Sequence, residues 1–155
     1  MHLVFDLDGT IMDSAEGIIN ALNHTLVAFG EEPRDPQSLT RFVGPSLKQI
    51  FAEVLNTSCA TAIDEAIVTY REYYFTRGYQ ESRPYPGIEQ TLSCLQEKTR
   101  TMRICTARRR DIATTIIKHF GLDAFFDDIH GCDLDGTKTE IIKSLLADGT
   151  IERRS

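Results

Sequence analysis

Two acidic residues near the amino terminus are spaced so that they could act together. Asp6 and Asp8 directly follow the apolar run at residues 3–5. In an extended segment, side chains two positions apart point to the same side, so both carboxylates can face one spot. Two carboxylates this close repel each other, and a magnesium ion would relieve the repulsion while leaving coordination positions for phosphate oxygens. Gly9 would allow a sharp turn that exposes backbone amides to an anion.

The five residues 6–10 have an identical copy at residues 133–137. The second copy follows a weaker apolar segment that contains Gly131. We expect a turn there, because Asp and Gly favour a bend. Neither copy fits a calcium-binding EF-hand loop, since that loop needs glycine at its sixth position, where Ile11 and Lys138 stand.

The elements that position Asp6 and Asp8 are of two kinds. After the first strand, Ser14 is expected to cap a helix that ends at Gly30, and apolar residues at helical spacing predict further helices over 47–55 and 60–75. Residues 14–82 therefore read as all-helical. Beyond Pro86 and Gly87, helix and strand alternate. The expected helices cover 88–97, 111–120 and 139–147, with a strand over 102–106 and a short apolar segment over 125–130.

Such alternation predicts a parallel sheet with crossover helices. The first strand, a short apolar run expected to be buried, must join this sheet, because a lone strand cannot satisfy its backbone groups. The predicted fold class is α/β, with a Rossmann-like parallel-sheet core at residues 1–13 and 83–155. An all-helical cap at residues 14–82 is inserted into this core.

Composition limits the partners and the location. The 155 residues are 41% hydrophobic, enough for one core and a smaller lobe. A net charge of −6 without a basic cluster beyond residues 108–110 argues against a nucleic-acid partner. We also expect no membrane partner and a cytoplasmic location, because no signal peptide and no run of about 18 apolar residues occurs. The four cysteines are dispersed, so reduced thiols are expected rather than a zinc site or disulfide framework.

Residues 6–14 follow the pattern D-x-D-G-T-[LI]-x-D-S after an apolar strand, and they resemble the first motif of the haloacid dehalogenase-like hydrolases. The strand that ends at Thr106 resembles the second motif, and Lys138 at the start of a helix resembles the third. Residues 39–47, together with residues 85–87, are most similar to the phosphoglycolate phosphatase-like branch with a helical cap. The resemblance covers nearly the whole chain.

The resemblance implies a role for each motif residue. Asp6 would be the nucleophile that forms an aspartyl phosphate, and Asp8 the general acid and then the base. Thr106 would hydrogen-bond a phosphoryl oxygen, and Lys138 would neutralise phosphoryl charge. The cofactor would be Mg²⁺, held by Asp6 and the backbone carbonyl of Asp8. Expected substrate-binding positions are Gly9, Thr10, Ala107, Arg108 and, in the cap, Gly44.

Other interpretations of these residues stay open. Thr106 could cap a helix or merely reflect the preference of threonine for strands. Lys138 could be a solvated surface lysine, and the arginine triplet could be a solvated helix entrance. Arg41, Gly44 and Ser46 could touch the substrate or simply terminate a helix.

The expected function is a magnesium-dependent phosphatase that hydrolyses a small phosphorylated metabolite. A β-phosphoglucomutase-like phosphomutase would pass the same phosphoryl group to a sugar. A receiver-like signalling domain also uses an aspartyl phosphate, but the helical insertion argues against it. No G-D-x-x-x-D-like motif follows Lys138. In the family that motif supplies the remaining magnesium ligand, so a catalytically impaired fragment with weak magnesium affinity is the third alternative. The substrate and the oligomeric state are not indicated.

Overall fold

The computed structural model describes residues 1–132, 137–147 and 149–151. The chain divides into two compact units. The sheet unit comprises Met1–Asp13 and Pro84–Ser155, and the helical unit comprises Ser14–Arg83. The second Asp-Leu-Asp-Gly-Thr copy, for which a turn is expected, lies outside the described residues except for Thr137.

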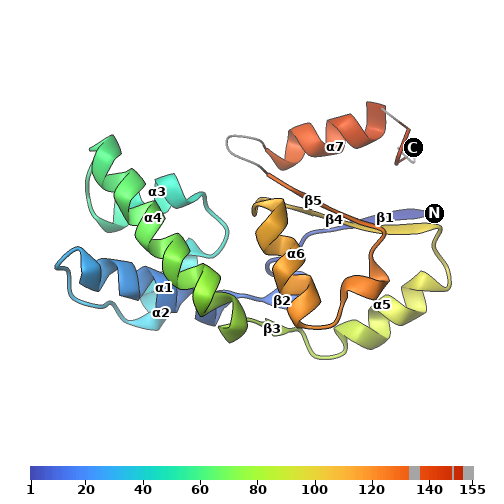
Figure 1. Ribbon diagram of the computed structural model, residues 1–155, viewed down its shortest axis with the longest axis horizontal. Coiled ribbons are helices and arrows are strands. Elements are labelled where there is room, and N and C mark those ends of the chain that lie inside the picture. Colours follow the sequence, from blue (N-terminus) through green and yellow to red (C-terminus); the bar gives the residue numbers. More distant parts are fainter. Residues whose placement is uncertain (133–136, 148, 152–155) are drawn as a thin grey trace. The chain divides into compact units, whose positions relative to one another are not determined.

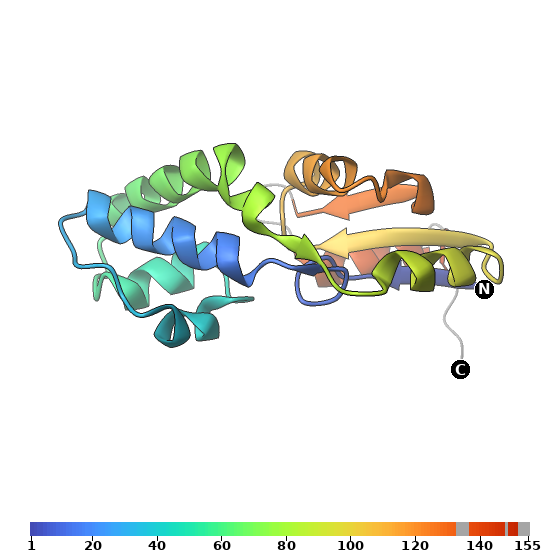
Figure 2. The same cartoon turned by 90° about the horizontal axis from the view of Figure 1, so that it is seen from below.

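The sheet unit contains three parallel strands in the order β1 (His2–Phe5), β4 (Thr101–Thr106) and β5 (Asp128–Gly131). Figures 1 and 2 show α5 (Ile88–Gln96) and α6 (Arg110–His119) on one face of this sheet and α7 (Lys138–Ala147) on the other. A 3-10 turn, η3 (Asp123–Phe125), precedes β5. The prediction of a parallel α/β fold is confirmed.

The middle strand, β4, forms the centre of this unit. Met102, Ile104, Cys105 and Thr106 are all buried. Helix α6 packs against the sheet through buried apolar residues at the i, i+3 and i+4 spacing of one helical face, namely Ala113, Ile116 and Ile117.

Strand β1 differs from the expectation of a buried strand. All four of its residues are only partly buried. The physical reason is its place in the sheet, because among the described strands it has a single neighbour, β4. One side of β1 thus lacks the packing that a central strand receives from both sides.

The helical unit is built from α1 (Ala15–Ala28), α2 (Pro36–Leu39), α3 (Leu47–Val54) and α4 (Ala60–Thr76). Two 3-10 turns, η1 (Thr40–Phe42) and η2 (Gly78–Glu81), complete it. Its interior includes an aromatic cluster: the rings of Phe51 and Tyr70 meet edge to face, and those of Tyr70 and Tyr74 stack. Helix α1 packs against α4 and η2.

Ser14 is the N-cap residue of α1, but its side chain makes no capping hydrogen bond. The expectation that it caps the helix is therefore right in position and wrong in mechanism. Ser14 is 1% exposed, so its hydroxyl belongs to the interior rather than to the open first turn of the helix. The two short strands where the chain passes between units, β2 (Met12–Asp13) and β3 (Arg83–Pro84), pair with each other. Within the described residues, no helix has the length and apolar character needed to cross a bilayer.

Candidate active site

The predicted site residues gather where the strands of the sheet unit end. Asp6 directly follows β1, and Thr106 is the last residue of β4. The two strands are parallel, and Phe5 lies in register with Ile104. Their carboxyl ends therefore meet at one edge of the sheet, which is where open α/β sheets bind ligands.

Asp6 is joined to the third predicted motif. Its Oδ2 pairs with Nζ of Lys138, the first residue of α7, and its Oδ1 accepts a hydrogen bond of 2.7 Å from the amide of Leu7. The side chains of Asp6 and Lys138 remain 37% and 36% exposed. A substrate can therefore reach both the carboxylate and its cation. This contact argues against the interpretation of Lys138 as merely a solvated surface lysine.

The chain turns sharply after Asp6. Gly9 has φ = +76°, a conformation that other residues rarely adopt, and the carbonyl of Leu7 accepts from the amides of Thr10, Ile11 and Met12. Leu7 and Ile11 are fully buried and anchor the turn. The amide of Gly9 donates to the carbonyl of Met12 at 2.8 Å. The expectation was that this turn exposes backbone amides to an anion. The amides of residues 9–12 instead bond within the turn, although Gly9 and Thr10 are both exposed.

Asp8 is held by an arginine. Nε of Arg108 donates to Oδ2 of Asp8 at 2.6 Å, and Nη2 donates to Oδ1 at 2.8 Å. The amide of Arg108 donates to the hydroxyl of Thr106 at 3.2 Å. Thr106 is 1% exposed, and Ala107 between them is exposed. The second predicted motif thus lies beside Asp8 as well as beside Asp6.

The three consecutive arginines have different partners. Arg109 pairs with Asp111, and Arg110 pairs with Asp128. The interpretation as a solvated helix entrance is therefore right for Arg109 and Arg110, which flank the start of α6, and wrong for Arg108.

A close backbone approach fixes the segment that carries Arg108. A Cβ atom added to Gly131 would lie 2.3 Å from the amide nitrogen of Arg110 and 2.5 Å from the carbonyl oxygen of Arg108. The next amide, that of Cys132, donates to this same carbonyl at 2.8 Å. A glycine inside a strand, such as Gly131, is a sequence signal of such a close approach.

Two buried thiols lie beneath the site. Burial raises the pKa of Cys105, and the nearby Cys132 and Asp6 raise it further, while Lys138 acts in the opposite direction. Cys105 and Cys132 form no disulfide, and neither do the exposed Cys59 and Cys94. The prediction of reduced cysteines agrees with this arrangement.

The oxygen donors at the site suit magnesium. The Asp6 carboxylate and the Asp8 carbonyl are hard oxygen ligands, and Mg²⁺ is commonly held by one or two carboxylates while it keeps waters and phosphate oxygens. Across the described part of the chain, no three His, Cys, Asp or Glu side chains gather as a metal-binding group. The donors that are present are thus oxygen atoms of the kind that Mg²⁺ prefers.

Gly44 belongs to the helical unit, in the segment before α3, with φ = +121°. Ser46 and Gln49 form a reciprocal capping box at the start of α3, and Arg41 pairs with Glu53. Ser46 therefore does terminate a helix, one of the two interpretations left open. The substrate-binding role of Gly44 stays a prediction.

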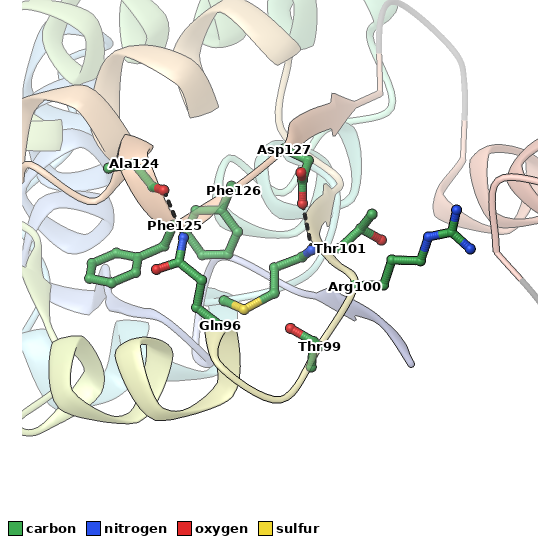
Figure 3. A pocket seen from close by; sticks show the side chains of 9 residues that line it. Gln96, Thr99, Arg100, Thr101, Ala124, Phe125, Phe126 and Asp127 are labelled. Carbon is green, nitrogen blue, oxygen red and sulfur yellow. Dashed lines mark hydrogen bonds between the residues drawn. The ribbon is translucent and has the colours of Figure 1, made fainter.

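A cavity of about 270 Å³ opens elsewhere in the sheet unit (Figure 3). It lies at the amino end of β4, where Gln96 donates to the carbonyl of Ala124 and the amide of Met102 donates to Asp127. Because the acidic residues follow the carboxyl ends of the strands, this cavity is separate from the candidate active site.

Several curated proteins are similar to this chain. A 5'-nucleotidase from Pseudomonas aeruginosa is 36% identical over 148 residues, which are 94% of this chain and 66% of the relative. A phosphoglycolate phosphatase from Agrobacterium fabrum is 32% identical, with 97% of this chain and 65% of the relative covered. The tyrosine-protein kinase PtkA of Mycobacterium tuberculosis is 30% identical, with 94% and 50% covered. The chain thus spans about half to two thirds of the length of these relatives.

Solved structures agree with the fold. A predicted phosphatase from Clostridium acetobutylicum is 37% identical and superimposes with a TM-score of 0.86. The match covers 97% of this chain and 71% of the solved chain. A haloacid dehalogenase-like family protein from Streptococcus pneumoniae is 30% identical, covers 97% and 70%, and has a TM-score of 0.87. The family model described as haloacid dehalogenase-like hydrolase matches residues 3–155. With its acidic pair, Thr106 and Lys138 converging at one sheet edge, this chain belongs to the haloacid dehalogenase-like hydrolases.

Proposed function

We propose that the protein is a magnesium-dependent phosphatase that hydrolyses a small phosphomonoester through an aspartyl phosphate on Asp6. The observation that carries the proposal is the contact between Asp6 and Lys138, with Asp8 two residues further along the same turn. A half-exposed carboxylate beside a fixed cation suits attack on a group that carries negative charge. Relatives named 5'-nucleotidase and phosphoglycolate phosphatase support hydrolysis of a phosphate ester.

In the first step, a carboxylate oxygen of Asp6 bonds to phosphorus and the ester bond to the leaving oxygen breaks. Asp8 gives a proton to that oxygen, so the product leaves as an alcohol. Lys138 stabilises the negative charge that spreads over the phosphoryl oxygens in the transition state, and the Thr106 hydroxyl hydrogen-bonds one of these oxygens.

In the second step, a water molecule attacks the same phosphorus while Asp8 accepts its proton. The bond between Asp6 and phosphorus breaks, and inorganic phosphate and the free carboxylate are restored. Bound at the Asp6 carboxylate and the Asp8 carbonyl, Mg²⁺ would supply positive charge for the phosphoryl oxygens. The helical unit would act as the cap that excludes bulk water and chooses the substrate.

The decisive variant is Asp6→Asn, which removes the nucleophile while keeping the size of the side chain. Release of inorganic phosphate would be measured with and without magnesium on phosphoglycolate, a nucleoside monophosphate, pyrophosphate and sugar phosphates. We expect turnover to fall by about 10³-fold or more. Asp123→Asn, an exposed position in η3, is the matched control and should keep full turnover. Unchanged turnover in Asp6→Asn would disprove the proposal.

A further inference from the structure

Gly131 is the last residue of β5 and lies against the loop that follows β4. It is in register with Thr106, the last residue of β4. A Cβ atom on Gly131 would meet the amide nitrogen of Arg110 at 2.3 Å and the carbonyl oxygen of Arg108 at 2.5 Å. Both atoms belong to the main chain, so no side chain could rotate to make room. The absence of a side chain at this position is therefore what allows the loop to lie against β5.

The need for glycine here comes from the contact and not from the backbone conformation. The φ angle of Gly131 lies outside the left-handed region, whereas Gly121 has φ = +69°. As part of β5 the backbone of Gly131 is extended, and an alanine adopts that conformation without strain. Ordinary contacts of a Cβ atom begin at about 3.4 Å, so an alanine would push the main chain of Arg110 away by about 1 Å.

The loop that lies against Gly131 orients the hydroxyl of Thr106. The carbonyl of Arg108 accepts from the amide of Cys132 at 2.8 Å, and the amide of Arg108 donates to Oγ1 of Thr106 at 3.2 Å. A hydroxyl has one hydrogen, and because Oγ1 already accepts from an amide, its own hydrogen must point to a different acceptor. Thr106 is 1% exposed, so bulk water does not compete for this arrangement. The main chain of Arg108 thus connects Gly131 to the donor hydrogen of Thr106.

We propose that Gly131 is a positioning residue for phosphoryl transfer: the loop that it admits holds the Thr106 hydroxyl so that its hydrogen points to a phosphoryl oxygen. This inference rests on the proposed function, in which that hydroxyl donates to the phosphoryl group. A donor that is fixed in advance stabilises the charge developing in the transition state without a cost of reorganisation. A misplacement of about 1 Å, caused far from the reacting atoms, is enough to lower a rate by about 100-fold.

The test is a double-variant cycle between Gly131 and Thr106. The values of kcat and KM are measured, on whichever compound of the panel above is hydrolysed fastest, for Gly131→Ala, Thr106→Val and the double variant. Thr106→Val keeps the branched shape and removes the hydroxyl. The control is Gly121→Ala, in the turn after α6. It strains the backbone at a positive φ and so costs stability, but nothing lies within 4 Å of the added Cβ atom.

We expect Gly131→Ala to lower kcat on the order of 10- to 100-fold, with a smaller change in KM, because the misdirected hydroxyl matters most in the transition state. Gly121→Ala should keep its kcat although its Tm falls. In the Thr106→Val background, Gly131→Ala should lower kcat by about twofold or less, since the hydroxyl is already gone. An unchanged kcat in Gly131→Ala overturns the inference, and so do losses that multiply in the double variant.

Binding of orthovanadate separates this inference from the proposed function. This oxyanion imitates the transferring phosphoryl group, and titration calorimetry measures its binding without turnover. If no compound is hydrolysed but Gly131→Ala and Thr106→Val weaken vanadate binding as much as the double variant does, the phosphatase proposal fails and the positioning role stands. Hydrolysis with equal kcat in Gly131→Ala and the unmodified chain removes only the positioning role. If no compound is hydrolysed and vanadate does not bind, or binds equally to every variant, both fail.

Amide hydrogen exchange of the unmodified chain, followed by NMR, tests the same link if Gly131→Ala does not fold. The amides of Cys132 and Arg108 should exchange slowly, because each is hydrogen-bonded within the loop contact. Fast exchange of the Cys132 amide would mean that β5 does not hold the Arg108 carbonyl, which overturns the inference. In a folded Gly131→Ala variant both amides should lose their protection, and in Gly121→Ala both should keep it.

Discussion

Asp6 and Lys138 are separated by 132 positions in the sequence and are in direct contact in the structure. The contact depends on two separate pieces of local structure, the end of β1 and the start of α7. The first motif is specific enough to predict from sequence that Asp6 is a site residue. Lys138 could be identified only by its order along the chain, because a lysine at a helix start is common.

Replacing Lys138 by alanine tests the electrostatic part of the site. We expect kcat to fall by about 10²- to 10³-fold, because the charge that develops on the phosphoryl oxygens loses a fixed cation. KM should change less, because the missing interaction is strongest in the transition state. Lys143→Ala, an exposed lysine on the same helix, is the control. Steady-state kinetics that show equal losses for both variants would contradict the role of Lys138.

Residue type alone does not distinguish Arg108 from its two neighbours, although the family resemblance placed Arg108 among the expected substrate-binding positions. Three identical cations follow β4, and which of them faces the acidic residues depends on the path of the chain between β4 and α6. That path is set by the contact with Gly131, a feature of two segments far apart in sequence. The contact between Arg108 and Asp8 is therefore a tertiary effect that local sequence pattern does not predict.

At the scale of elements, α7 begins with a reciprocal hydrogen-bonded cap. The amide and the hydroxyl of Thr137 donate to the carboxylate of Glu140, and the amide of Glu140 donates to the Thr137 hydroxyl. These bonds to Thr137, the backbone one first, lower the pKa of Glu140. Thr137 closes the second copy of the repeated pentapeptide, so this residue positions the helix that begins with Lys138.

Thr137→Ala should loosen the start of α7 and lower the Tm by about 2–4 °C near neutral pH. Since the folded pKa of Glu140 lies below its ordinary value, the cap stabilises fully above that ordinary value and fades as the pH falls through the folded pKa. The difference in Tm should therefore shrink in acid. Thr139→Ala is the control on the same helix. The Tm values are measured by scanning calorimetry. A difference in Tm between Thr137→Ala and the unmodified chain that does not change with pH would contradict the role of the cap.

The long helices and the strand β4 follow their sequence patterns closely. The predicted bounds differ from the observed ones by one residue at one end for the helices 47–55, 60–75, 88–97 and 139–147 and the strand 102–106. The helix 111–120 is shifted by one residue at both ends. Short elements were not predicted, because the three or four residues of η1 and α2 carry no periodicity. The prediction that β1 is buried is wrong for a different reason. An apolar run of three residues does not reveal how many neighbouring strands it will have.

At the scale of the molecule, each unit has its own interior. Phe51 and Tyr74 are fully buried in the helical unit, and Ile104 and Ile117 in the sheet unit. The change from helix alone to helix alternating with strand is visible in the sequence because the two kinds of element have different apolar periods. The reactivity of each cysteine, in contrast, depends on whether its thiol is buried, and the spacing of the cysteines in the sequence does not indicate that.

The sheet unit should lose stability in alkali because of Cys105. Burial raises the pKa of its thiol above the ordinary value of 9.0, so the folded state favours the neutral form. The contribution of this group to stability is complete below the unfolded pKa and is lost as the pH rises through the folded pKa. The same burial keeps Cys105 a poor nucleophile near neutral pH, because the thiolate is the reactive form.

Labelling the native protein with an aromatic disulfide reagent should therefore resolve two classes of thiol. Cys59 and Cys94 are exposed and should react fast, while Cys105 and Cys132, which are 4% and 8% exposed, should react only as the structure opens. Absorbance should show half of the amplitude in a fast phase, and adding denaturant should release the remainder. A Cys59→Ser, Cys94→Ser double variant should lose the fast phase alone. Four thiols reacting in one fast phase would contradict the buried position of Cys105 and Cys132, and with it the packing of β4 and β5 beneath the candidate active site.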